Sequence, residues 1–113
     1  MAFEASLEMT EGGIAKVTLV GELDGSNAAD FRTTVEEAAS KNCKRLVLML
    51  GGLDYIASAG IRVLVFARQK MGGGVEIFAI SPTPQVNETI EMTGMHYSLR
   101  VLPEYDAAVV ETF

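Results

Sequence analysis

Ser58 lies in a setting where a serine hydroxyl could be modified. It belongs to the segment DYIASAGI, residues 54–61, where the pattern predicts a short loop that becomes a helix. A serine at a helix start commonly caps the helix with its hydroxyl. The free backbone N–H groups and the positive dipole end at the same place also favour an added phosphate, and the small neighbouring residues leave the hydroxyl accessible. Two interpretations of Ser58 follow, a structural cap and a phosphorylation site.

Glu22 and Asp24 form a second group that could carry function. They end the second predicted strand, at the edge of the sheet where loops of α/β folds collect functional residues. The sequence therefore places an acidic pair beside the Ser58 loop. The alternative is that both are ordinary turn and helix-start residues, since aspartate favours those positions.

Other residue types offer weaker chemistry. Gly72–Gly74 follow a predicted helix, whereas phosphate-binding loops follow a strand and lead into a helix, so we interpret them as a helix stop. His96 is the single histidine, and Cys43 is the single cysteine, with no base nearby. Glu88 and Glu91 are three apart on a helix, which is typical of a solvated face. The sequence predicts no enzyme active site, cofactor or metal site, and a small nucleotide-binding α/β domain is the alternative from another class.

The elements that must position these residues alternate along the chain. An EGG turn at residues 11–13 joins the first two strands, Ser26 or Asn27 is suited to cap the first helix, and Thr83 with Pro84 opens the third. Helical spacing places residues 61, 64, 65 and 68 on one side of the second predicted helix. The predicted strands cover residues 3–9, 14–20, 46–50, 75–80 and 99–102, and the predicted helices cover residues 27–40, 58–72, 84–94 and 104–111.

This alternation predicts an α/β fold with a mixed, mostly parallel sheet, an N-terminal antiparallel hairpin and about four helices. Leu46–Leu50 is a continuous apolar run, the pattern of a central strand covered on both faces. Neither an internal repeat nor a linker divides the chain, so residues 1–113 are expected to form one domain.

The composition narrows the classes of partner. Apolar residues make up 49% of the chain and the formal net charge is -6, which favours a folded domain and disfavours binding to nucleic acid or to an anionic membrane surface. With a single cysteine the chain has no need of an oxidising compartment, and it shows neither an export signal nor an apolar run of membrane-spanning length. We expect a cytoplasmic protein.

Several motifs in order resemble the STAS domain of sulphate transporters and anti-sigma factor antagonists. GELD at residues 21–24, followed by Asn27 and Ala28, is similar to the family's signature after its second strand. Residues 46–50 and the segment YIASAGIRVL, residues 55–64, are similar to its central strand and phosphorylation loop. Residues 73–77, 81–82 and 93–95 resemble its fourth strand, the turn that follows and the end of its third helix. The resemblance runs from about residue 3 to residue 110 and implies a single STAS-like domain.

The resemblance implies a regulatory mechanism. The unphosphorylated protein would bind an anti-sigma factor that is also a serine kinase, and so free a sigma factor for RNA polymerase. Phosphorylation of Ser58 by that kinase would release the complex, and a separate serine phosphatase acting on phosphorylated Ser58 would reset it. The resemblance puts the partner-binding surface at Glu22, Asp24, Asn27, Tyr55, Ala57, Ala59, Gly60, Ile61 and Leu64.

The sequence departs from the family pattern in two places. Ala57 stands where the family very often has an aspartate before the phosphorylated serine, and Met49-Leu50-Gly51 replaces an aspartate, hydrophobe, serine triplet. The first departure bears on recognition by a kinase. A STAS scaffold that binds partners without phosphorylation is therefore the alternative within the same class.

Overall fold

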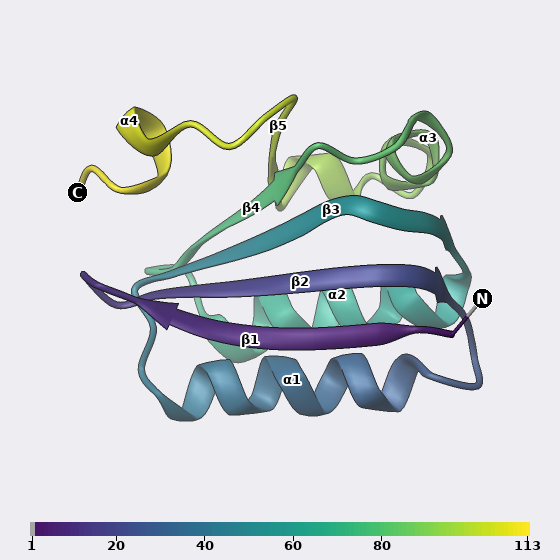
Figure 1. Ribbon diagram of the computed structural model, residues 1–113, viewed down its shortest axis with the longest axis horizontal. Coiled ribbons are helices and arrows are strands. Elements are labelled where there is room, and N and C mark those ends of the chain that lie inside the picture. The colour runs from purple at the N-terminus through teal and green to yellow at the C-terminus, as the bar shows by residue number, and fades with distance from the viewer. Residues whose placement is uncertain (1) are drawn as a thin grey trace.

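Five strands form one mixed sheet in the computed structural model, which describes residues 2–113 (Figure 1). Their order in the sheet follows the chain, β1-β2-β3-β4-β5. β1 is antiparallel to β2, and all other neighbours are parallel. The predicted fold class, with its N-terminal antiparallel hairpin, is confirmed. The strands are β1 (Glu4–Thr10), β2 (Ile14–Leu23), β3 (Arg45–Ile56), β4 (Glu76–Ile80) and β5 (Arg100–Leu102).

The helices lie on both sides of this sheet. Figure 1 shows α1 and α2 side by side beneath one face, with α4 across the other. The large hydrophobic cluster contains residues of α1, α2 and α3, while Val110 of α4 packs with Ile14, Val47, Phe78 and Ile80 in a second cluster. The helices are α1 (Ala28–Ser40), α2 (Ser58–Met71), α3 (Pro84–Met92) and α4 (Ala107–Val110), with a single 3₁₀ turn, η1 (Met95–Tyr97), after α3.

β3 is the central strand, and its residues alternate between the two clusters. Leu46, Leu48 and Leu50 belong to the cluster under α1 and α2, while Val47 belongs to the cluster under α4. This alternation explains why the apolar run is continuous, as expected for a strand buried on both faces.

β3 is longer than the sequence predicted. Residues 51–55, which we expected to form a short loop, continue the strand to Ile56. β2 also continues, to Leu23, and pairs with this stretch from Val20 opposite Gly52 to Leu23 opposite Ile56, with one register shift just before Val20 and a second between Gly21 and Glu22. The prediction of a loop was wrong because pairing with β2 gives hydrogen-bond partners to backbone N–H and C=O groups in this stretch.

Several predicted helix ends are confirmed. Thr83 accepts a hydrogen bond from the Val86 N–H, and Pro84 occupies the first turn of α3. Gly72 ends α2 with φ of 77° and Gly94 follows α3 with φ of 76°, both in the region that favours glycine. The terminal helix is shorter than predicted, because the Asp106 side chain caps it at the Ala108 N–H. Among the described residues, none of the helices has the length and apolar character that crossing a bilayer requires.

Candidate functional site

The carboxyl ends of β2 and β3 meet at one edge of the sheet. Leu23 pairs with Ile56 in the parallel ladder, and the carbonyl oxygen of Leu23 accepts a hydrogen bond from the Ala57 N–H at 2.8 Å. The next residue of each chain segment is Asp24 on one side and Ser58 on the other. The structure therefore brings the two groups that sequence analysis singled out to one edge, where α1 and α2 also begin (Figure 1).

Ser58 is the first residue of α2, and it is exposed. Ala57 occupies the N-cap position, and no side chain caps the helix. The interpretation of Ser58 as the cap is therefore wrong, because a cap has to precede the first helical residue. Within residues 2–113 its hydroxyl has no hydrogen-bond partner, and the first turn of α2 carries no acid. The hydroxyl is therefore accessible to solvent.

Gly60 lets α2 approach the two strand ends closely. A Cβ at this position would lie 2.7 Å from Leu23 Cγ and 2.8 Å from Ile56 Cγ1, much closer than real Cβ contacts. A glycine is therefore required for α2 to begin where it does. Through this contact, the position of Ser58 is fixed by the ends of β2 and β3.

Three residues expected at the partner-binding surface face inward. Gly60, Ile61 and Leu64 are buried, and the side chains of Ile61 and Leu64 belong to the large hydrophobic cluster, where they stabilise α2 against the sheet. Val65, expected on the same side of α2, is instead 39% exposed. The outer surface at the start of α2 is formed by Ala59 and Arg62 together with Ser58.

Asp24 uses its carboxylate within its own turn. One oxygen accepts hydrogen bonds from the Ser26 hydroxyl at 2.6 Å and the Ser26 N–H at 2.9 Å. The hydroxyl bond is the largest cause, and these bonds hold the pKa of Asp24 below its ordinary value. Asp24 is thus a fixed negative charge at the edge that also holds Ser58.

Asn27 fastens the end of β2 to the start of α1. Its side-chain oxygen accepts a hydrogen bond from the Asp24 N–H, and its side-chain NH₂ donates to the Glu22 carbonyl oxygen, both at 2.9 Å. It is the N-cap residue of α1 but caps no helical N–H with its side chain. The structure therefore gives Asn27 an internal role.

Glu22 and Tyr55 are neighbours across the β2–β3 ladder and both are exposed, Tyr55 at 41%. Ala57 and Ala59 are half-buried beside Ser58. These residues, with Asp24 and Ser58, lie where β2 and β3 end and α2 begins, and we call this set the switch edge.

A groove of about 320 Å³ runs between α1 and α2 next to the switch edge. Its lining includes Ala28 and Arg32 from α1, and Ala59, Arg62 and Phe66 from α2. Sequence analysis missed the two arginines. The signal that could have found Arg62 is its spacing, four residues after Ser58 on the same predicted helix.

A larger hollow of about 590 Å³ lies at the opposite end of the strands, near the start of β3 and β4. The two arginines that line it donate hydrogen bonds to backbone carbonyl oxygens. Arg45 donates to the Val109 and Val110 carbonyls at 2.7 and 2.6 Å, and Arg68 donates to the carbonyls of Gly72, Val75 and Ser98. These guanidinium groups hold the fold together rather than forming an open site.

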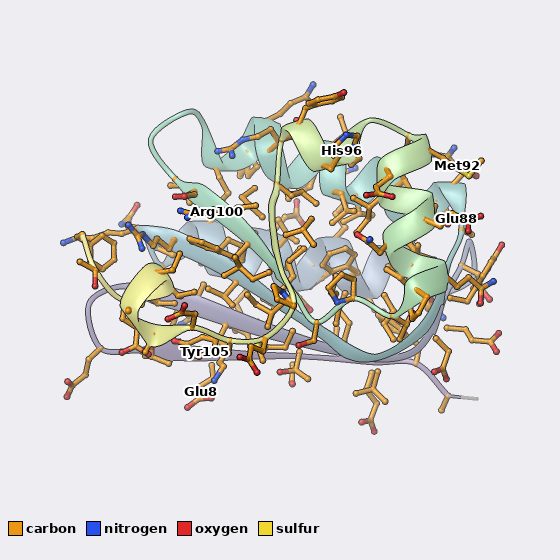
Figure 2. All side chains as sticks on the ribbon, turned by 90° about the horizontal axis from the view of Figure 1, so that it is seen from above. Glu8, Glu88, Met92, His96, Arg100 and Tyr105 are labelled. Atoms are coloured by element: carbon orange, nitrogen blue, oxygen red, sulfur yellow. The ribbon has the colours of Figure 1, made fainter. Side chains whose placement is uncertain are left out.

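The remaining candidates lie away from the switch edge. The sulfur of Cys43 is 3.7 Å from that of Met71, and burial raises its pKa. His96 lies in η1, with its ring 4.0 Å from that of Tyr97, and Met92 projects from the end of α3 (Figure 2). Glu88 and Glu91 are exposed. Residues 2–113 contain no group of three metal-ligating side chains.

Comparison with known proteins adds to this geometry. The STAS domain model matches residues 8–108. The chain is 35% identical over 83 residues to BtrV of Bordetella bronchiseptica, covering 73% of this chain and 72% of that protein. It is 30% identical over 100 residues to an anti-sigma F factor antagonist of Paenibacillus polymyxa, covering 86% and 82%.

Solved structures share the fold. An anti-sigma factor antagonist from Mycobacterium paratuberculosis superposes with a TM-score of 0.83 at 22% identity, covering 98% of this chain and 96% of that one. The Bacillus cell fate determinant SpoIIAA in its phosphorylated form superposes with a TM-score of 0.70 at 17% identity, covering 97% of each chain.

Proposed function

Because the chain belongs to the STAS domain family, and within it to the anti-sigma factor antagonists, we propose that it binds an anti-sigma factor while Ser58 is unphosphorylated. Anti-sigma factor antagonists are regulators rather than enzymes. In the proposed cycle the anti-sigma factor is also a serine kinase, which transfers the terminal phosphoryl group of ATP to the Ser58 oxygen. ADP is the leaving group, the hydroxyl proton is lost, and the kinase then dissociates. A separate serine phosphatase removes the phosphate. Binding frees a sigma factor, so the cycle regulates transcription that depends on it, and its proposed compartment is the cytoplasm.

The observation that carries this proposal is the free hydroxyl of Ser58 at the switch edge. Ser58 is exposed, begins α2 and lies next to the joined ends of β2 and β3. A phosphoserine adds nearly two negative charges at neutral pH. Here they would appear on the outer surface while the core under Gly60 stays packed, so a docking surface can lose its partner without unfolding.

The partner surface that we propose is the switch edge itself. Glu22 and Tyr55 supply exposed polar and aromatic contact area, and Asp24 supplies a fixed charge. Ala57 and Ala59 keep the approach to Ser58 unobstructed by long side chains.

The test is phosphorylation in vitro with the anti-sigma kinase of the same bacterium and ATP. Wild type should take up one phosphate, and Ser58→Ala should take up none. Ser6→Ala is the matched control, since Ser6 is exposed in β1, and it should be phosphorylated like wild type. Equal incorporation into wild type and Ser58→Ala would contradict the proposed switch.

Ala57 favours a second candidate function, a scaffold that binds its partner regardless of phosphorylation. Neither the cap position nor the first turn of α2 offers an acid to a kinase. Under this alternative, Ser58→Asp binds the anti-sigma factor as tightly as wild type. Under the switch, Ser58→Asp weakens that binding at least tenfold, which calorimetry measures directly.

A further inference from the structure

Arg62 is placed to meet a phosphate on Ser58. The two residues are four apart on α2, so they lie on successive turns about 40° apart around the helix axis, at neighbouring positions of its surface. Both are exposed. Arg62 lines the groove between α1 and α2, as does Ala59, the residue after Ser58.

The guanidinium of Arg62 is uncommitted in the unphosphorylated protein. Among residues 2–113 the salt bridge joins Arg100 to Glu76, and Arg62 makes no ion pair or hydrogen bond. This contrasts with Arg45 and Arg68, which are bound to backbone carbonyls. No acidic residue lines the groove.

A second positive charge faces Arg62 from α1. The guanidinium carbon of Arg32 lies 4.1 Å from the centre of the Phe66 ring, which holds it over the same groove. Two cations therefore share a groove that has no counter-charge of its own, in a chain whose formal net charge is -6.

We propose that Arg62 is an internal receptor for the phosphate on Ser58, with Arg32 adding a second positive charge. Guanidinium pairs with phosphate through two parallel N–H···O bonds, which are stronger than bonds between neutral groups. Phosphorylation then turns an open, positive groove into a neutralised one beside a new negative edge. The inference rests on the proposed function only for the source of the phosphate.

The acidic residues of the switch edge disfavour the phosphate dianion, whereas Arg62 favours it. Asp24 and Glu22 lie at the end of β2, near Ser58, and repel a phosphate dianion. Their effect is the same in every variant of Arg62, so comparing variants isolates the arginine.

The test measures the second pKa of phosphoserine, about 6 without neighbours, by ³¹P NMR in protein that carries phosphoserine incorporated at Ser58 during translation. No kinase is needed. An arginine that binds the dianion lowers this pKa, so Arg62→Gln should raise it by about half a pH unit, as expected for one exposed charge-assisted pair. Arg32→Gln should raise it less.

Lys70→Gln is the matched control, because it removes one positive charge from the other end of α2, where the residue is also exposed. It should leave the phosphate pKa unchanged. Equal pKa values in wild type and Arg62→Gln would overturn the inference. A normal Arg62 effect with no kinase labelling of Ser58 would instead contradict the proposed function alone, so the two failures are distinguishable.

Discussion

Ser58 and Ser26 lie at the same edge of the sheet but differ in the hydrogen bonding of their hydroxyl groups. The hydroxyl of Ser26 donates to the Asp24 carboxylate at 2.6 Å, while that of Ser58 has no partner within residues 2–113. A hydroxyl already bonded to a carboxylate is held in one orientation, and its modification would cost that bond. At the level of single residues, this difference leaves the Ser58 hydroxyl unbonded among the described residues, as the proposed phosphorylation requires.

The same bond sets the charge state of Asp24. In Ser26→Ala the hydroxyl bond is lost and the backbone bond can stay, so the pKa of Asp24 should rise toward its ordinary value of 3.8. Because the folded pKa is depressed in wild type, the associated stabilisation is present above the unfolded pKa and is lost as pH falls through the folded pKa. Titration of the Asp24 carboxyl carbon by NMR measures the change, and an unchanged pKa would show that the hydroxyl bond is not its main cause.

At the scale of elements, α2 depends on a residue with no side chain. Alanine in place of glycine normally stabilises a helix by about 1 kcal/mol. At Gly60 the added methyl would meet Leu23 and Ile56 at less than 3.0 Å. We expect this clash to win, so that Gly60→Ala lowers the free energy of unfolding by about 1–3 kcal/mol, measured by urea denaturation.

Gly74→Ala is the control for this prediction, since a Cβ there meets nothing within 4 Å. It should change stability by less than about 0.5 kcal/mol. If Gly60→Ala were as stable as Gly74→Ala, α2 would have room to shift, and its start would not be fixed by the strand ends.

α4 depends on an arginine from β3. Arg45 donates to the carbonyls of Val109 and Val110, and its guanidinium carbon lies 4.3 Å from the centre of the Phe113 ring. Arg45→Met should lower the free energy of unfolding by about 2 kcal/mol, because these are charge-assisted bonds. It should also speed hydrogen exchange in residues 107–110.

Arg100→Met is the comparison for Arg45→Met. Arg100 pairs with Glu76, and the side chains are 53% and 40% exposed, so its loss should cost less than about 1 kcal/mol. Equal losses in the two variants would contradict the role given to Arg45.

The sequence predicted which helices and strands form better than it predicted which of their residues are buried. Periodicity identified every strand and α-helix, and the pairing of strand ends brought Ser58 near Asp24 as expected. It could not show that residues 51–55 extend β3, because glycines and polar residues in a strand look like a loop until the partner strand is known. The resemblance to the STAS family, rather than periodicity, put Ile61 and Leu64 on the partner surface, and the structure buries both side chains in the large hydrophobic cluster.

At the scale of the whole molecule, the two faces of the sheet are covered unequally. The large cluster under α1, α2 and α3 is closed by long helices, while the second cluster is closed by the short α4 and by Tyr105. The switch edge adjoins the first cluster at one end of the strands. The C-terminal segment seals the second.

Tyr105 makes the stability of this C-terminal segment depend on pH in the alkaline range. Burial, with a 2.5 Å hydrogen bond to Glu111 and repulsion by its charge, raises the pKa of Tyr105 to about 12 from an ordinary 10.0. Because the folded pKa is the higher one, this stabilisation is present below pH 10.0 and is lost as pH rises toward 12. Thermal unfolding should show wild type losing more stability than Tyr105→Phe over that range. Parallel pH profiles for the two proteins would contradict the assignment.

The outer edge of β1 has a consequence for encounters between copies of this chain. β1 ends the sheet, and Glu4, Ser6 and Glu8 alternate along its exposed side. If two such edges paired antiparallel about Ser6, Glu4 of one copy would lie opposite Glu8 of the other, twice over. Like charges directly opposite each other disfavour pairing. The β1 edges of two copies therefore repel each other, which disfavours edge-to-edge aggregation.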